Sequence, residues 1–336
     1  MNIQRYTDPS VFEQLAEPWE TLIKTTQRSD LFFMTPQWQQ TWWKHLGRGE
    51  LNVLAICGDD GEFNGIASWL IEDTDTGQTV QTVGCIEVAD YLDVIIKPGS
   101  EQESYTALLD YALSDEAPEW QAFNLCNIPE SSATLSLLAD LASQRGLHTQ
   151  TIDEDVSPVL ELPANYDDYL SQLDKKQRQE LRRKRRRADA LDIGWYTVGE
   201  EHDLDEEIDA FLKLMAMSTT EKSVFLQEEG NATFFREIGH VMFDAGILEL
   251  VFLVINEERA ATMWQFAYED RMLLYNSGLN VADFGALSPG IVLLTHSIGD
   301  AIERGFKYYD FLQGDEEYKY RMGAQNTQVK NLVISR

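Results

Sequence analysis

The chain has 336 residues, and 43% of them are hydrophobic, which is enough to build two domains with packed cores. No apolar run reaches the ~18 residues of a membrane-spanning helix, and the first residues, MNIQRYTDPS, lack the apolar segment of a secretory signal. We therefore expect no membrane insertion and a cytoplasmic location. The formal net charge of −30 opposes binding to nucleic acids and anionic membranes over most of the surface.

Cysteine and histidine predict no metal site. Cys57, Cys85 and Cys126 lie far apart inside apolar segments, so we expect reduced core residues and no disulfide framework. The five histidines form no pair at the spacing of metal ligands and no Ser-His-Asp signature.

The first half of the chain mixes helices and strands. Trp38, Trp42 and Trp43 are spaced to bury one stripe of a helix, so we expect core anchors. Apolar periodicity and turn residues predict helices at 9–25, 35–47, 101–114 and 131–145, and strands at 51–57, 65–71, 79–83, 91–96 and 120–126.

The second half repeats this order. Strands are predicted at 248–255, 260–268 and 272–279, followed by a helix from Ser288 to Gly305 and a strand at 307–312. The order from Leu51 to Asn127 thus recurs from Leu248 to Leu312. We expect two copies of one α/β unit, an N-terminal domain over 1–155 and a C-terminal domain over 156–336.

The helix at Ser288 begins in a way that suits an anion. Ser288 is an N-cap candidate, Pro289 fits the first turn, and Gly290 leaves the backbone uncovered. Amides at a helix start point outward with the positive end of the dipole, which favours phosphate. The alternative interpretation is an ordinary capped helix beside a core strand.

Five motifs carry a family resemblance: DYLD (90–93), LRRKRRR (181–187), NSGL (276–279), SPG (288–290) and YDFLQGDEEYK (309–319). They resemble GNAT-type acyltransferases of the branch linked to cellulose and exopolysaccharide biosynthesis, over nearly the whole chain. The resemblance implies a mixed α/β fold of two tandem GNAT-like domains, each a mostly antiparallel mixed sheet flanked by helices. It further implies that the second domain binds acetyl-CoA or another acyl-CoA and that the first, degenerate domain shapes the acceptor side.

The resemblance also suggests site residues. Acyl transfer needs a base for the acceptor and an acid for the leaving thiolate; Asp315 and Glu316 are the carboxylate candidates, and Tyr318 and Tyr275 the hydroxyl candidates. The carboxylates are equally explained as a solvated turn. Expected donor contacts are Gly285, Ser288, Gly290, Ile291, Arg182 and Arg183, and expected acceptor or acyl contacts are Asp90, Asp93, Trp264, Asp310 and Lys319. The usual Q/R-x-x-G-x-G/A phosphate loop is replaced by NVADFGALSPG at 280–290.

A basic segment interrupts this acidic chain. Nine of the 13 residues from Lys175 to Arg187 are basic and one, Glu180, is acidic, so the segment carries +8 and the rest of the chain −38. We expect it within a helix over 169–191. It either neutralises the acidic body, binds donor phosphates or binds an anionic acceptor; nucleic acid is disfavoured, because no aromatic residue interleaves the cations.

Three functions follow from these features. The first is acyl transfer from acyl-CoA to an amine or hydroxyl of a sugar or amino-acid derivative. The chain also resembles Fem-like peptidyl transferases that use aminoacyl-tRNA, in which case the basic helix would meet tRNA. The third is a non-catalytic binding module of a polysaccharide-related complex. The sequence predicts no oligomeric state.

Overall fold

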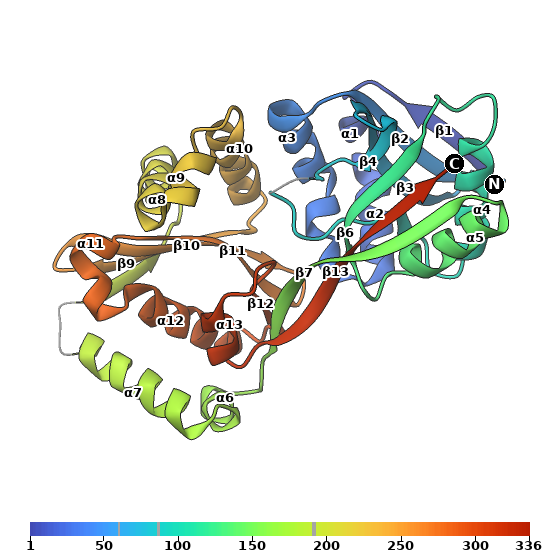
Figure 1. The fold of residues 1–336 in the computed structure, drawn as a ribbon. Coiled ribbons are helices and arrows are strands. Elements are labelled where there is room, and N and C mark those ends of the chain that lie inside the picture. Colours follow the sequence, from blue (N-terminus) through green and yellow to red (C-terminus); the bar gives the residue numbers. More distant parts are fainter. Residues whose placement is uncertain (60, 86–87, 190–192) are drawn as a thin grey trace. The chain divides into compact units, whose positions relative to one another are not determined.

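The computed structural model describes residues 1–59, 61–85, 88–189 and 193–336, without the side chains of 185 and 187–189. Two compact units divide the chain: Met1–Val156 with Thr327–Arg336, and Ser157–Asn326 (Figure 1). The expected C-terminal domain, 156–336, differs from the second unit in its last residues, which belong to the first unit.

A mixed sheet forms the first unit. Four strands run antiparallel in sequence order: β1 (Asn2–Tyr6), β2 (Glu50–Cys57), β3 (Phe63–Thr74) and β4 (Gly77–Thr82). After a crossover, β6 (Ala122–Pro129) lies parallel to β4, and β13 (Gln325–Ser335) closes the order antiparallel to β6. The expected strand at 91–96 is only β5 (Ile95–Ile96), paired with β3.

The helices of the first unit are α1 (Val11–Gln14), α2 (Ala16–Thr26), a 3-10 helix (Ser29–Met34), α3 (Pro36–Leu46), α4 (Glu101–Ala112), a π-helical turn (Thr134–Leu138) and α5 (Ala139–Gln144). The helix expected at 9–25 is broken at Leu15, whose ψ of 5° leaves the helical region. Trp38 and Trp42 are buried as predicted, whereas Trp43 is only half-buried. Trp38 packs edge-on against Phe32 and Phe33 of the 3-10 helix.

The prediction of three reduced cysteines is wrong, because Cys85 and Cys126 form a disulfide. Cys57 is a free thiol. The two bonded residues are 41 positions apart, so only the fold brings them together.

The second unit repeats the sheet of the first. Its antiparallel strands are β8 (Ile193–Thr197), β9 (Leu248–Ile255), β10 (Glu258–Tyr268) and β11 (Arg271–Leu279), and β12 (Tyr308–Asp310) lies parallel to β11. The end of β7 (His148–Glu161) closes it antiparallel to β12. Each half of the chain therefore ends in a strand that completes the sheet of the other unit. The predicted mixed α/β class is confirmed.

Helices cover both faces of this second sheet (Figure 1). On one face lie α8 (Leu204–Ser218), α9 (Thr220–Phe225) and α10 (Asn231–Asp244). On the other lie α6 (Tyr166–Gln172), α7 (Lys175–Asp189), α11 (Val281–Phe284), a 3-10 turn (Gly285–Leu287), α12 (Pro289–Glu303) and α13 (Glu317–Arg321). Apolar residues of α12, among them Leu293, Leu294 and Ile298, pack on β10 and β11.

The helix predicted over 169–191 is two helices. Leu173 is extended (φ −74°, ψ 150°), and Asp174 Oδ1 accepts a 2.8 Å hydrogen bond from the Gln177 amide at the start of α7. Its predicted end at Leu191 lies outside the described residues. In the part of the chain that the structure describes, no single helix has the length and apolarity to cross a membrane; Val281–Leu287 and Pro289–Glu303 meet that criterion only jointly, across a 63° bend.

Candidate functional site

The strands β11 and β12 stop pairing and diverge at the candidate site. They pair in parallel only from Arg271↔Tyr308 to Leu273↔Asp310, after which β12 ends and β11 continues to Leu279. A β-bulge follows immediately: Gln265 of β10 pairs with Leu274 and Trp264 pairs with Asn276, so Tyr275 is the extra residue. Bulges bend a strand and redirect its side chains.

A cavity of about 300 Å³ opens beside this divergent part of β11. Its walls are mostly apolar and come from β10, β11, the segment before α12, the start of α12, and α13: Met263, Leu274, Ser277, Leu279, Val281, Gly285, Ser288, Pro289, Gly290, Ile291, Leu294 and Tyr318. Four expected donor contacts (Gly285, Ser288, Gly290, Ile291) and one expected acid (Tyr318) are thus brought together. Such walls suit an apolar or amide-bearing chain.

The start of α12 offers fewer amides to an anion than its sequence suggested. Ser288 is left-handed (φ 54°, ψ 55°) and makes no side-chain cap. Its carbonyl accepts hydrogen bonds from the amides of Ile291 and Val292, at 3.1 and 3.2 Å. Pro289 has no N–H, so Gly290 supplies the remaining first-turn amide.

Gly290 is also explained by packing. A Cβ added there would lie 2.9 Å from Leu279 Cδ2 of β11. The absent side chain therefore lets the start of α12 approach the strand that lines the cavity.

An open groove of about 690 Å³ lies between α7 and α13, and Ile291 and Tyr318 line both this groove and the cavity. Lys176, Arg183, Lys184 and Arg321 are its basic side chains. Arg183 binds Glu180 at 2.7 Å and Arg321 binds Glu317 at 2.6 Å. Arg182 is exposed and does not line this groove, so only one of the two expected basic contacts lies there.

The loop after β12 is organised by Lys319. The buried ammonium donates to the carbonyls of Leu312, Gln313 and Gly314 at 3.2, 2.6 and 3.0 Å and forms an ion pair with Glu316 at 2.9 Å. The loop needs such a clamp, since Leu312 and Gly314 both have positive φ (55° and 112°). These contacts make Lys319 a positioning residue for the loop rather than a free acceptor contact.

The expected carboxylates, Asp315 and Glu316, and the expected acid, Tyr318, differ in how exposed they are. Asp315 and Glu316 are exposed, and Asp315 accepts a hydrogen bond from the Tyr320 hydroxyl. Tyr318 is half-buried, and burial, helped by the charge of Glu316, raises the pKa of its hydroxyl well above the usual range. Among the described residues the Tyr318 hydroxyl has no hydrogen-bond partner, and Tyr318 is one of the residues that line the cavity.

Tyr275 and Trp264 lie elsewhere. Trp264 is fully buried, with ring centroids 4.9 Å from Phe211 and 5.5 Å from Phe235. Tyr275 packs against Phe235 and Phe266 at 5.7 and 5.3 Å. Neither side chain lines the cavity, so the roles expected of Tyr275 as an acid and of Trp264 as an acyl contact stay predictions.

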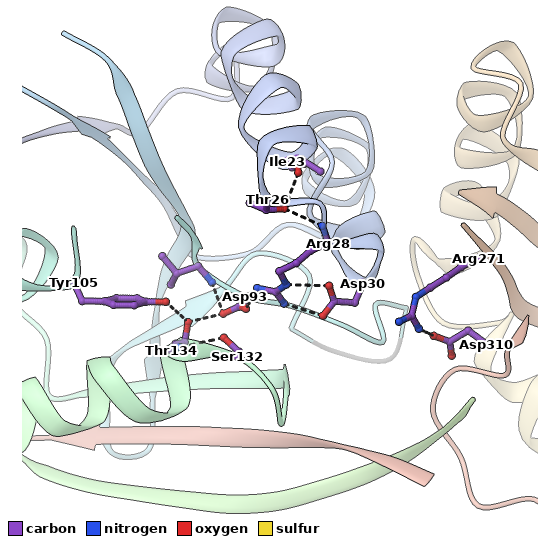
Figure 2. A network of polar contacts seen from close by, with 11 residues as sticks. Ile23, Thr26, Arg28, Asp30, Asp93, Tyr105, Ser132, Thr134, Arg271 and Asp310 are labelled. Carbon is purple, nitrogen blue, oxygen red and sulfur yellow. Dashed lines mark hydrogen bonds and ion pairs between the residues drawn. The ribbon is translucent and has the colours of Figure 1, made fainter. Parts of the chain in front are cut away.

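Two expected acceptor contacts are buried in ion pairs inside their own units (Figure 2). In the first unit Asp93 binds Arg28 at 2.6 Å and accepts from the Thr134 hydroxyl at 2.5 Å. Although burial alone would lower the pKa of Arg28, Asp93 and Asp30 raise it above its ordinary value. In the second unit Asp310 binds Arg271 at 2.8 Å. The buried ion pairs of both aspartates therefore contribute to the stability of the fold.

Asp90 stands apart from this pair of buried aspartates. It is half-buried in the segment before β5, so it is the more accessible acid of the DYLD motif. Its expected contact with an acceptor stays a prediction.

Lys222 is a site residue that the sequence did not reveal. Its ammonium donates to the Ser277 carbonyl at 2.7 Å and lies 3.5 Å from Ser277 Oγ, whose residue lines the cavity. Burial lowers the pKa of Lys222 to about 8; the charge of Glu316 opposes this shift and that of Lys319 adds to it. No motif surrounds Lys222, and only the packing of α8 on β11, with α9 against α8, brings it here.

Comparison with known proteins places this site in a family domain. Residues 175–320 match the family model described as an acetyltransferase (GNAT) domain. No curated protein sequence matches the chain. The matched region contains the cavity, α7, Lys222 and Tyr318.

Solved structures share the fold over the whole chain. FemX superimposes with a TM-score of 0.66 at 13% identity, covering 98% of this chain and 97% of that one. The C-terminal domain of a putative lysylphosphatidylglycerol synthetase from Agrobacterium fabrum gives a TM-score of 0.58 at 9% identity, covering 97% of this chain and 92% of that one. A tandem GNAT protein of the clavulanic acid biosynthesis pathway gives a TM-score of 0.51 at 10% identity, covering 98% of both chains. At such identities the likeness shows the fold, and that fold is the tandem GNAT arrangement.

Proposed function

We propose that the GNAT-type acetyltransferase domain over residues 175–320 transfers an acyl group from an acyl-CoA to an amine or hydroxyl acceptor. The observation that carries this proposal is the apolar cavity of about 300 Å³ beside the divergent part of β11, with the start of α12 on one side and Tyr318 on the other. A thioester arm of amide and methylene groups suits such walls.

The charged end of the donor has a separate place in this proposal. Because the start of α12 supplies few free amides, we assign the donor phosphates to the adjoining groove, where Arg183 and Lys184 of α7 and Arg321 of α13 lie. Arginine forks bind phosphate oxygens in pairs, and α7 places several cations on one element. Exposed Arg182 then contributes only long-range attraction.

Tyr318 and the carboxylates divide the proton transfers. The hydroxyl of Tyr318 stays protonated at neutral pH, so it is suited to donate its proton to the leaving thiolate. Glu316 and Asp315 lie on the loop that precedes α13, shortly before this acid in the sequence. They are our candidates for receiving a proton from the acceptor through water.

We place the acceptor among amine- or hydroxyl-bearing sugars and amino acids, with exopolysaccharide precursors first. This choice of acceptor rests on the sequence motifs alone, and we propose a cytoplasmic location from the short apolar runs of the sequence. Transfer of an amino acid from charged tRNA is the second candidate, favoured by the exposed cations Lys175, Lys176, Arg182 and Arg186 on α7.

Thiol release and thermal shift test the proposal together. A coenzyme A or acyl-CoA present at 100 times its dissociation constant should add about 2.7 kcal/mol to the free energy of unfolding, and the productive donor should release thiol in the presence of acceptor. Stabilisation by charged tRNA without any response to acyl-CoAs would instead favour aminoacyl transfer.

Two tyrosine variants form a matched pair. Tyr318→Phe should lower kcat about 100-fold or more, because it removes the acid that lines the cavity. Tyr275→Phe should leave kcat within about threefold, since its ring packs on the opposite face of the sheet. Equal effects of the two substitutions would contradict the assignment of the cavity.

A further inference from the structure

Three residues of β11, Ser277, Gly278 and Leu279, fasten the strand to the junction of α8 and α9. The Leu279 amide donates a 2.7 Å hydrogen bond to Ser218 Oγ at the end of α8, and Lys222 of α9 reaches the Ser277 carbonyl at 2.7 Å. Between them, a Cβ on Gly278 would lie 2.6 Å from the Met215 amide nitrogen. The segment NSGL is therefore in backbone contact with α8 on one side, while Ser277 and Leu279 line the cavity.

Lys222 is held where its amine can exchange a proton. Thr219 Oγ1 caps α9 by accepting from the Lys222 amide at 3.2 Å, which sets the start of the helix beside β11. The ammonium has the Ser277 carbonyl and Ser277 Oγ as its hydrogen-bond partners among the described residues. In its neutral form the Lys222 amine can still donate an N–H···O hydrogen bond to the Ser277 carbonyl, and its lone pair can then accept from the Ser277 hydroxyl.

We infer that Ser277 and Lys222 form a proton relay that removes the proton of the acceptor, an inference that rests on the proposed acyl transfer. The acceptor nitrogen or oxygen forms the new bond to the acyl carbon, and the carbon–sulfur bond breaks. The acceptor proton passes to Ser277 Oγ as the Ser277 proton passes to Lys222 Nζ, which becomes an ammonium. The thiolate takes a proton from Tyr318, and Lys222 and Tyr318 return to their starting forms by exchange with solvent.

The charges around Lys222 make it adjustable near neutral pH. Burial, the largest effect, lowers its pKa to about 8, so a useful fraction is neutral at physiological pH. The loop before α13 contributes Glu316, which opposes the shift, and α13 contributes Lys319, which reinforces it. In this relay Glu316 sets the proton affinity of Lys222, and the relay replaces the water-mediated route through Glu316 and Asp315.

The test measures the lysine both with and without turnover. Trace acetylation by acetic anhydride from pH 6 to 11, followed by peptide mass spectrometry of the full chain, should give Lys222 a labelling midpoint near pH 8, against about 10.4 for an ordinary lysine. In thiol-release assays, Lys222→Arg, which keeps the cation but not the exchangeable neutral form, should lower kcat at least 100-fold and abolish the limb of the pH profile near 8. Glu316→Gln should move that limb to lower pH.

The outcomes separate two failures. A labelling midpoint near 10.4, or a Lys222→Arg or Ser277→Ala variant with the wild-type pH profile, overturns the relay while acyl transfer stands. Absence of thiol release by the wild-type chain from every acyl-CoA tested overturns the proposed function and, with it, the use of the relay.

Discussion

The Lys319 ammonium lies 2.9 Å from the Glu316 carboxylate, yet the two side chains differ in exposure: 2% for the lysine and 56% for the glutamate. The lysine also holds three carbonyls of the loop after β12, whereas solvent can replace it as a partner for the glutamate. The pair is therefore unequal in what each residue contributes to stability.

We expect Lys319→Met to lower the free energy of unfolding by about 3 kcal/mol, because three buried or half-buried carbonyls lose their donor. Glu316→Gln should lower it by less than about 1 kcal/mol, since an exposed partner contributes little. Urea unfolding of both variants measures the difference, and equal losses would show that the ion pair, and not the carbonyl contacts, holds the loop.

The buried aspartates should behave alike although they lie in different units. Asp93→Asn and Asp310→Asn should each cost about 2 kcal/mol, because a hydrogen-bonded charge pair with a partly exposed arginine is broken. Glu317→Gln, in the exposed pair with Arg321, is the control and should cost less than about 0.5 kcal/mol. Chemical denaturation provides the values; a neutral effect of Asp310→Asn would show that its ion pair with Arg271 does not stabilise the fold.

Substitution of Gly278 should mainly lower stability, whereas substitution of Gly290 should mainly weaken donor binding. In Gly278→Ala the new Cβ meets backbone atoms of α8 at 2.6 Å, so we expect a loss of about 3 kcal/mol. In Gly290→Ala it meets the end of the Leu279 side chain at 2.9 Å, which can turn away. Its stability should stay within about 1 kcal/mol of wild type, while the displaced Leu279 narrows the cavity and weakens donor binding. Unfolding curves and donor titrations test the order; a more damaging Gly290→Ala would contradict it.

The pKa of Lys222 predicts a pH-dependent stability. The folded-state pKa is about 8 and the unfolded-state pKa about 10.4, so between these values the unfolded chain binds more protons than the folded chain. Stability of the wild type should therefore rise with pH across this window relative to Lys222→Met, and the difference should be constant below about pH 7. Parallel urea titrations at pH 7 and 9.5 measure it; a difference that does not change would place the lysine at its ordinary pKa.

Salt dependence separates the arginines of α7. Arg183 lines the groove and Arg182 does not. Arg183→Ala should weaken coenzyme A binding several-fold more than Arg182→Ala at low salt, and the gap should shrink as salt screens the contact. Identical titrations of the two variants would remove the groove from the donor site.

Local patterns predicted much of the second unit. The three strands from Leu248 to Leu279, the helix after Ser288 and the crossover strand appear where apolar runs, turn residues and helix-start signals indicate, because these features act over a few neighbouring residues. The order of elements also indicated the duplication. It did not indicate the exchange of the last strands, because pairing of β7 with β12 and of β13 with β6 joins residues far apart in sequence.

The choice of side chains at the cavity depended more on tertiary structure than the positions of the helices and strands did. Strict alternation along β11 would put Tyr275 on the same face as Ser277 and Leu279. The bulge inserts one residue at Tyr275, so Leu274 joins Ser277 and Leu279 at the cavity and Tyr275 turns to α10. A bulge is set by how two strands and the helices on them fit together, and the chain near Tyr275 carries no mark of it.

The sequence by itself determined most of the elements and their repeated order, because hydrophobic period and helix-start chemistry are local properties; the donor site at the helix after Ser288 is our proposal. Only the tertiary structure decided which side chains share that site. It buried Asp93 and Asp310 in ion pairs, occupied Lys319 with carbonyls, and brought Lys222 to Ser277, since desolvation and partner geometry exist only once distant segments pack.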